Sequence, residues 1–160
     1  MIDEEKSERL VRFFEDLLAF YQKFLALERE KYSVVLSEKL ESLDECMNRE
    51  QAFSLKARGL ESSRQELLKE IGVQQSTFRE LIPQVDLSRQ EQMRNLYQEL
   101  SNTVSSIQSV NSKCTKMIRV KSGRVSHLLA QAQNHPELKQ IYGSKLQSAA
   151  EHPVSFSKKI

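Results

Sequence analysis

The feature that most constrains this chain is a seam of residues spaced three and four apart through residues 93–132. The successive intervals are 3, 4, 4, 3, 4, 3, 4, 3, 4, 3 and 4, close to the 3.5-residue repeat of coiled-coil helices. The seam consists of Met93, Leu96, Leu100, Val104, Ile107, Asn111, Cys114, Ile118, Lys121, Val125, Leu128 and Ala132. Its two polar members, Asn111 and Lys121, are more typical of register control than of ligand binding. The repeat predicts one long helix over about 87–133.

Two earlier segments carry the same helical periodicity. Residues 4–36 place Leu10, Phe14 and Leu17 on one stripe, and residues 38–71 repeat the pattern from Leu40 onward. Gly72 follows this second segment and predicts its C-terminal cap. Between the long helices, residues 77–82 predict a short helix that Pro83 stops.

Capping residues are predicted for the two later helices. Ser76 precedes the short helix and is the expected N-cap. The last long helix is expected to start at Asp86 or Ser88, and Ser88 with Glu91 has the spacing of a capping box.

These patterns predict an all-α fold, an elongated antiparallel three-helix bundle or coiled coil with a short connecting helix. We expect the bundle to occupy residues 1–135 and a flexible tail to follow at 136–160. The N-terminus is acidic and no apolar run reaches the roughly 18 residues of a membrane span. We therefore expect a cytoplasmic protein without membrane insertion.

Charge is distributed unevenly along the chain. Residues 1–50 carry 13 acids and 8 bases, whereas residues 100–160 carry 2 acids and 9 bases. Five of these bases fall on the last long helix: Lys113, Lys116, Arg119, Lys121 and Arg124. This face is interpreted as solvated, as paired with the acidic first helix, or as a docking surface for an acidic partner. Nucleic-acid binding is disfavoured because no aromatic residue occurs between Tyr97 and Tyr142.

The chain has no arrangement that predicts catalysis, a metal or a cofactor. Its histidines, His127, His135 and His152, lack metal-ligand spacing. Cys46 and Cys114 are far apart in the sequence and are expected to be small core residues. A chain of long helices without such chemistry is expected to bind another protein rather than to act as an enzyme.

The last long helix has more apolar residues than one seam needs, which suggests a binding surface. The candidates are Ile107, Val110, Cys114, Met117, Ile118, Val125, Leu128 and Leu129. Two alternatives stay open. A structural coiled-coil protein would cover the same residues by forming a homo-oligomer, and a nucleic-acid adaptor would use the basic charge.

Several short motifs resemble the FlgN-type flagellar export chaperones. They are Leu17-Leu18-x-x-Tyr21-x-x-Phe24-Leu25, Leu40-x-x-Leu43, Leu96-x-x-x-Leu100-x-x-x-Val104, Val110-Asn111-x-x-Cys114, Tyr142-Gly143 and the terminal Lys158-Lys159-Ile160. The resemblance implies a cytoplasmic chaperone that binds terminal helices of hook–filament junction proteins and delivers them to the flagellar export gate.

The resemblance also implies where these contacts occur. The client would bind the helix around Val110 to Leu129, and Tyr142 would dock to the export gate. Export chaperones are often acidic, so the basic character of this helix departs from the family pattern.

Overall fold

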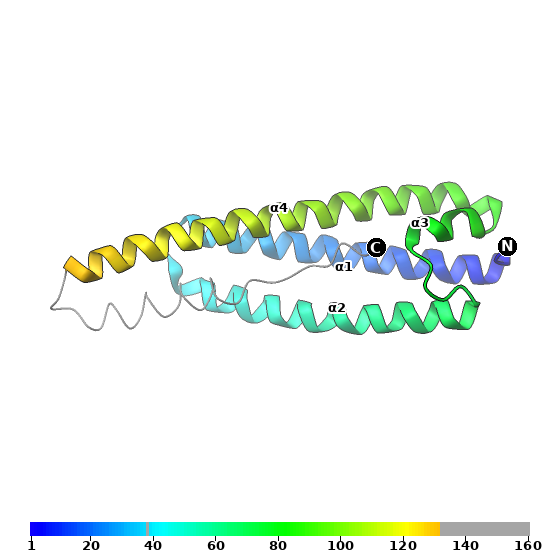
Figure 1. Ribbon diagram of the computed structural model, residues 1–160, viewed down its shortest axis with the longest axis horizontal. Coiled ribbons are helices and arrows are strands. Elements are labelled where there is room, and N and C mark those ends of the chain that lie inside the picture. The colour runs from blue at the N-terminus through cyan, green and yellow to red at the C-terminus, as the bar shows by residue number, and fades with distance from the viewer. Residues whose placement is uncertain (38, 132–160) are drawn as a thin grey trace. The chain divides into compact units, whose positions relative to one another are not determined.

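The computed structural model describes residues 1–37 and 39–131, and the side chains of Leu129 and Gln131 are outside the description. The helices are α1 (Glu4–Leu36), α2 (Leu43–Ile71), α3 (Phe78–Leu81) and α4 (Leu87–Gln131), with 3₁₀ turns at Leu40–Ser42 and Ile82–Gln84 (Figure 1). No strand occurs among the described residues, and the predicted all-α fold is confirmed. The predicted tail at 136–160 lies outside the described residues.

The described chain packs as two compact units. Unit 1 consists of Met1–Leu25 and Phe53–Ser106, and unit 2 consists of Ala26–Ala52 and the residues from Ile107 onward. The three long helices thus each contribute one part to unit 1 and another to unit 2.

Unit 1 has a large apolar core. Thirteen buried residues form it: Ile2, Leu10, Val11, Phe14, Leu17, Leu18, Leu68, Phe78, Leu81, Val85, Met93, Leu96 and Leu100. Phe78 of α3 is its centre, with ring centroids 3.9 Å from Phe14 and 5.4 Å from Tyr97. The short connecting helix therefore covers the apolar core at the N-terminal ends of α1 and α4.

Polar contacts fix the helix directions inside unit 1. Arg9 donates to Glu70 at 2.6 Å, which brings the start of α1 to the end of α2. Gln92 donates to Glu15 at 2.8 Å, one turn into α4. Within this unit α1 therefore runs antiparallel to α2 and parallel to α4.

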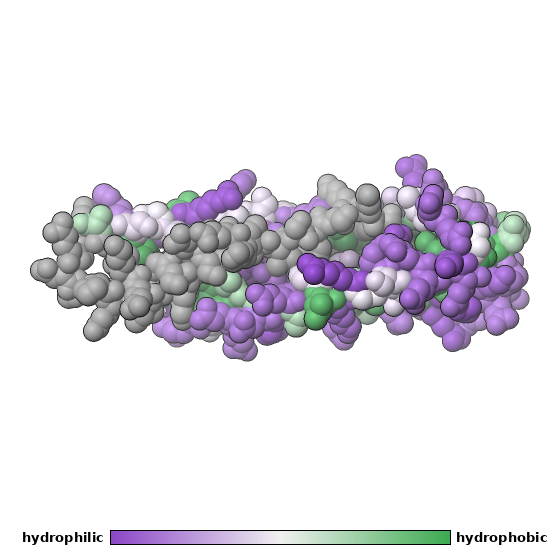
Figure 2. Space-filling model, turned by 60° about the horizontal axis from the view of Figure 1, so that its bottom comes forward, coloured by the Kyte–Doolittle hydropathy of each residue, from purple (hydrophilic) through white to green (hydrophobic). Residues whose placement is uncertain are grey.

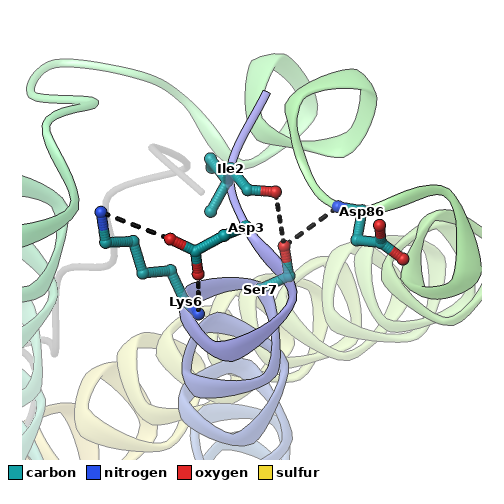
Figure 3. Close-up of polar contacts among 5 residues, drawn as sticks. All are labelled: Ile2, Asp3, Lys6, Ser7 and Asp86. Carbon is teal, nitrogen blue, oxygen red and sulfur yellow. Dashed lines mark hydrogen bonds and ion pairs between the residues drawn. The ribbon is translucent and has the colours of Figure 1, made fainter.

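A network around Ser7 ties the first residues to the start of α4 (Figure 3). The fully buried Ser7 hydroxyl donates to the Ile2 carbonyl at 3.3 Å and accepts from the Asp86 amide at 3.0 Å. The Ile2 amide donates to the Gln84 carbonyl at 2.7 Å. Asp3 caps α1, because its side chain accepts from the Lys6 amide at 2.8 Å.

Unit 2 has a smaller apolar core among the described residues. Its buried members are Val35, Leu40, Leu43, Cys114 and Ile118. Leu40 and Leu43 belong to the turn that begins α2, so the connection between α1 and α2 is held by its own apolar side chains. Lys121 donates from Nζ to the Ser37 carbonyl at 2.8 Å. This contact satisfies a carbonyl at the C-terminal end of α1, where a cation is favourable.

The helix ends partly match the sequence predictions. Gly72 has φ of 92°, and the amides of Gly72 and Val73 both donate to the Leu68 carbonyl, so the predicted C-terminal cap is confirmed. The prediction for Ser76 was wrong. Thr77 is the N-cap and forms a reciprocal capping box with Glu80.

The capping box predicted for Ser88 and Glu91 was also wrong. α4 begins at Leu87, two residues earlier than a Ser88 cap requires. The Asp86 carboxylate instead accepts from the Ser88 amide at 3.0 Å and from its hydroxyl at 2.5 Å. A carboxylate bears more negative charge than a hydroxyl and is the stronger acceptor at a helix start.

Candidate partner-binding segment of the last helix

The part of α4 that belongs to unit 2 contains the residues predicted to bind a partner. Ile107, Cys114 and Ile118 are 0%, 0% and 1% exposed. Cys114 and Ile118 pack in the core with Val35 of α1 and Leu43 of α2. These three residues face inward, and a partner cannot reach them while unit 2 is closed.

The remaining predicted residues differ in their exposure. Val110, Met117 and Val125 are half-buried. Leu128 is 60% exposed. The side chain of Leu129 and all of Tyr142 lie outside the described residues. The predicted residues therefore fall into two groups. Ile107, Cys114 and Ile118 are buried and are called the inner seam, and the others with a described side chain are half-buried or exposed.

The outer surface of this segment combines cations with two apolar residues. Lys116, Val120, Arg124 and Leu128 are exposed and four residues apart, so they form one stripe along the helix. Val120 is 49% exposed and was missed in the sequence analysis because it lies outside the seam. Its spacing of four from Lys116 and Arg124 was the available signal. We call Lys116, Val120, Arg124 and Leu128 the outer stripe.

None of the four cations Lys113, Lys116, Arg119 and Arg124 forms an ion pair within residues 1–37 and 39–131. All four are exposed. The interpretation that this face pairs with the acidic first helix finds no ion pair to support it in the described part of the chain. The charges are available to solvent or to a partner.

Figure 2 shows the hydropathy of one face of the molecule. Hydrophilic residues cover most of the described surface on that face, and hydrophobic residues appear in small separate places. This distribution is ordinary for a folded protein surface. The outer stripe is distinguished by the regular four-residue spacing of its members and by its two cations, Lys116 and Arg124.

A layer of charged side chains lies inside unit 2. Lys31 of α1 donates to both carboxylate oxygens of Glu50 of α2, at 3.1 and 2.9 Å. Their side chains are only 3% and 4% exposed. Glu28, one turn earlier on α1, is 0% exposed, and its oxygens accept no hydrogen bond from the described residues. We call Glu28, Lys31 and Glu50 the polar layer.

The pKa values of these groups explain how three ionisable side chains can be buried together in unit 2. Burial raises the pKa of Glu28 to about 9, and the neighbouring Glu50 carboxylate adds to the rise. Burial acts to lower the pKa of Lys31, but the Glu50 carboxylate outweighs it and leaves that pKa raised. At neutral pH Glu28 is therefore protonated and uncharged, while Lys31 and Glu50 are an ion pair. The polar layer is neutral overall.

Both cysteines are free thiols buried in unit 2, as predicted for small core residues. Burial raises the pKa of the Cys114 thiol to about 11 and also raises that of Cys46. A thiol is a nucleophile only when ionised, so neither is reactive at neutral pH. No group of three or more potential metal ligands occurs in the described residues, and none of the described helices is long and apolar enough to cross a membrane.

The fold and this segment define a class of protein: a helical bundle whose last helix exposes a regularly spaced stripe of cationic and apolar side chains. Comparison with family models gives the particular family. The model described as FlgN protein matches residues 1–150, and the chain belongs to the FlgN family. Comparison with curated proteins and with solved structures gave no match.

The predicted FlgN resemblance is thereby confirmed. Family membership makes the protein a flagellar export chaperone, in a family that binds export substrates and is not enzymatic.

Proposed function

We propose that this protein is a cytoplasmic chaperone that binds the terminal helices of hook–filament junction proteins and delivers them to the flagellar export apparatus. The observation that carries the proposal is the second half of α4. Its inner seam is apolar, its outer stripe consists of residues spaced four apart, and no acidic residue follows Glu99 in the described chain.

Helix-in-groove recognition accounts for this arrangement. A client helix that polymerises after export must be covered beforehand, and an apolar seam with half-buried flanks offers a substitute partner. Val110, Met117 and Val125 are the half-buried flanks, and Leu128 is the exposed anchor. In this proposal Ile107, Cys114, Ile118 and Leu129 complete the client site, and Tyr142 contacts the export gate.

Direct titration tests the proposal. The full chain is titrated with fluorescent peptides that carry the C-terminal helices of candidate junction proteins, and the dissociation constant is measured by anisotropy. Val120→Ser and Leu128→Ser each remove an exposed apolar side chain from the outer stripe. We expect each to weaken binding about 5- to 30-fold, the range of a typical interface anchor.

A matched control lies in unit 1. Leu55 of α2 is 70% exposed, slightly more than Leu128 at 60%, so Leu55→Ser removes an exposed leucine elsewhere, and we expect unchanged affinity. Absence of binding by the wild-type chain, with a stable homodimer in sedimentation experiments, would instead support the self-associating coiled coil. Equal losses in Leu55→Ser and Leu128→Ser would show that the outer stripe is not the client site.

A further inference from the structure

The inner seam of α4 is closed to partners in this structure. Ile107, Cys114 and Ile118 are at most 1% exposed, yet they are the most apolar part of the segment that the proposed function assigns to the client. A client helix can contact them only after α1 or α2 has moved away from α4 in unit 2.

The polar layer indicates where unit 2 is weakest. Lys31 and Glu50 satisfy each other through two hydrogen bonds, but Glu28 keeps its carboxyl buried without a donor from the described residues. Desolvating such groups costs free energy that an apolar layer of the same shape would not lose. The contacts between α1 and α2 are therefore less favourable here than in the apolar layers on either side.

The groups around Glu28 come from all three helices. Lys31 lies on the same helix, Glu50 and Cys46 lie on α2, and Cys114 lies on α4, with electrostatic interactions linking them. Asn111, also on α4, has its amide oxygen buried. The polar layer thus reaches the inner seam of α4 at Cys114.

The apolar cores of the two units are unequal. In the described chain, sixteen buried apolar residues lie in unit 1 and eight lie in unit 2. Local opening costs least where few apolar contacts must be broken. Fewer buried apolar contacts therefore have to be broken to open the described part of unit 2 than to open unit 1.

We propose that unit 2 opens at the polar layer of Glu28, Lys31 and Glu50, and that this opening uncovers the inner seam of α4 for a client helix. The inference rests on the proposed function for its ligand, but the opening itself is a property of the free protein. The polar layer lowers the free energy needed to open unit 2. The client therefore binds an open state that is a minor population of the free protein.

Native-state hydrogen exchange of the full chain tests the opening without any client. In the wild type, amides of residues 107–121 are expected to exchange at least 10-fold faster than those of residues 93–104 on the same helix. Glu28→Met replaces the buried carboxyl with an apolar side chain of similar length and leaves the Lys31–Glu50 pair intact. It is expected to slow exchange over 107–121 about 10-fold.

Glu30→Met is the matched control. Glu30 is exposed on the same turn of α1 and pairs with Arg49 at 2.9 Å, so this change should leave exchange over 107–121 unaltered. If Glu28→Met fails to fold, Glu28→Gln provides the decision, because its neutral amide has nearly the same shape as the protonated carboxyl and cannot ionise. Equal exchange across α4 in the wild type, or unchanged or faster exchange in the folded Glu28 variant, overturns the proposal.

Titration with the junction-protein peptides then separates this proposal from the proposed function. Apparent affinity scales with the fraction of open protein, so a variant that slows exchange 10-fold should bind about 10-fold more weakly, with a lower association rate. If the wild type binds no peptide, the proposed function fails while exchange still decides the opening. If peptides bind equally well to Glu28→Met and wild type despite slowed exchange, the link between opening and binding is refuted.

Discussion

Raising the pH from 5.5 to 8.5 is expected to destabilise the folded protein through Glu28. The folded-state pKa of Glu28 is about 9, against 4.5 ordinarily, so the folded chain holds a proton that the unfolded chain releases above about pH 4.5. The stabilisation is complete below that pH and is lost as the pH rises through 9. Each unit between these values costs about 1.4 kcal/mol, which gives an upper bound of roughly 4 kcal/mol over this range.

Glu28→Gln should remove this dependence. The amide has no titratable proton, so the variant is expected to gain up to about 3 kcal/mol at pH 7 and to lose the slope above pH 5.5. The assay is urea unfolding followed by helical circular dichroism at pH 5.5, 7.0 and 8.5. Asp3, Glu80 and Asp86 have lowered pKa values, so their contributions change only at more acidic pH.

Glu30→Gln is the control for this experiment. The Glu30 side chain is 51% exposed and pairs with Arg49, so its removal should change the stability by less than about 1 kcal/mol and leave the slope intact. A wild-type stability that stays flat from pH 5.5 to 8.5 would refute the reasoning. So would a slope that persists unchanged in Glu28→Gln.

Three further changes test the packing of unit 1 by thermal and urea unfolding. Ser7→Ala removes two buried hydrogen bonds and should cost about 1–3 kcal/mol, whereas Ser63→Ala, at an exposed hydroxyl, should cost less than about 0.5 kcal/mol. Phe78→Ala empties the centre of the core and should cost about 3–5 kcal/mol; a loss below about 1 kcal/mol would contradict the central packing of α3. Thr77→Ala removes one side of a capping box and should cost about 1 kcal/mol, with no loss contradicting the assigned cap.

The heptad seam of α4 was predictable as far as Ile118. Met93, Leu100, Ile107 and Cys114 are all fully buried, as their spacing predicts. Periodicity gives the face of a helix but not the length of the helices packed against it. α1 ends at Leu36, and Lys121 already contacts Ser37. The seam continues beyond the end of α1, which explains why Leu128 is exposed although it occupies a seam position.

The polar layer was not predicted, because charged residues are mostly exposed and a run such as Glu28–Lys31 is typical of a solvated face. Its burial depends on Glu50, which lies 19 residues from Lys31 in the sequence and on another helix. The spacing of residues in α2 did indicate that Glu50 could be buried. Glu50 follows Leu43 by seven residues and so occupies a position equivalent to a buried one.

The anchored N-terminus has a practical consequence for how the protein is produced. Met1 is 87% exposed, whereas Ile2 is 7% exposed and its amide donates to Gln84 at 2.7 Å. A fusion or affinity tag joined to Met1 extends into solvent and leaves these contacts in place. A chain processed to begin at Ile2 would put a charged ammonium group where a buried amide belongs. The start of α4 would then be disturbed by a change made at the first residues of the chain, more than 80 residues earlier in the sequence.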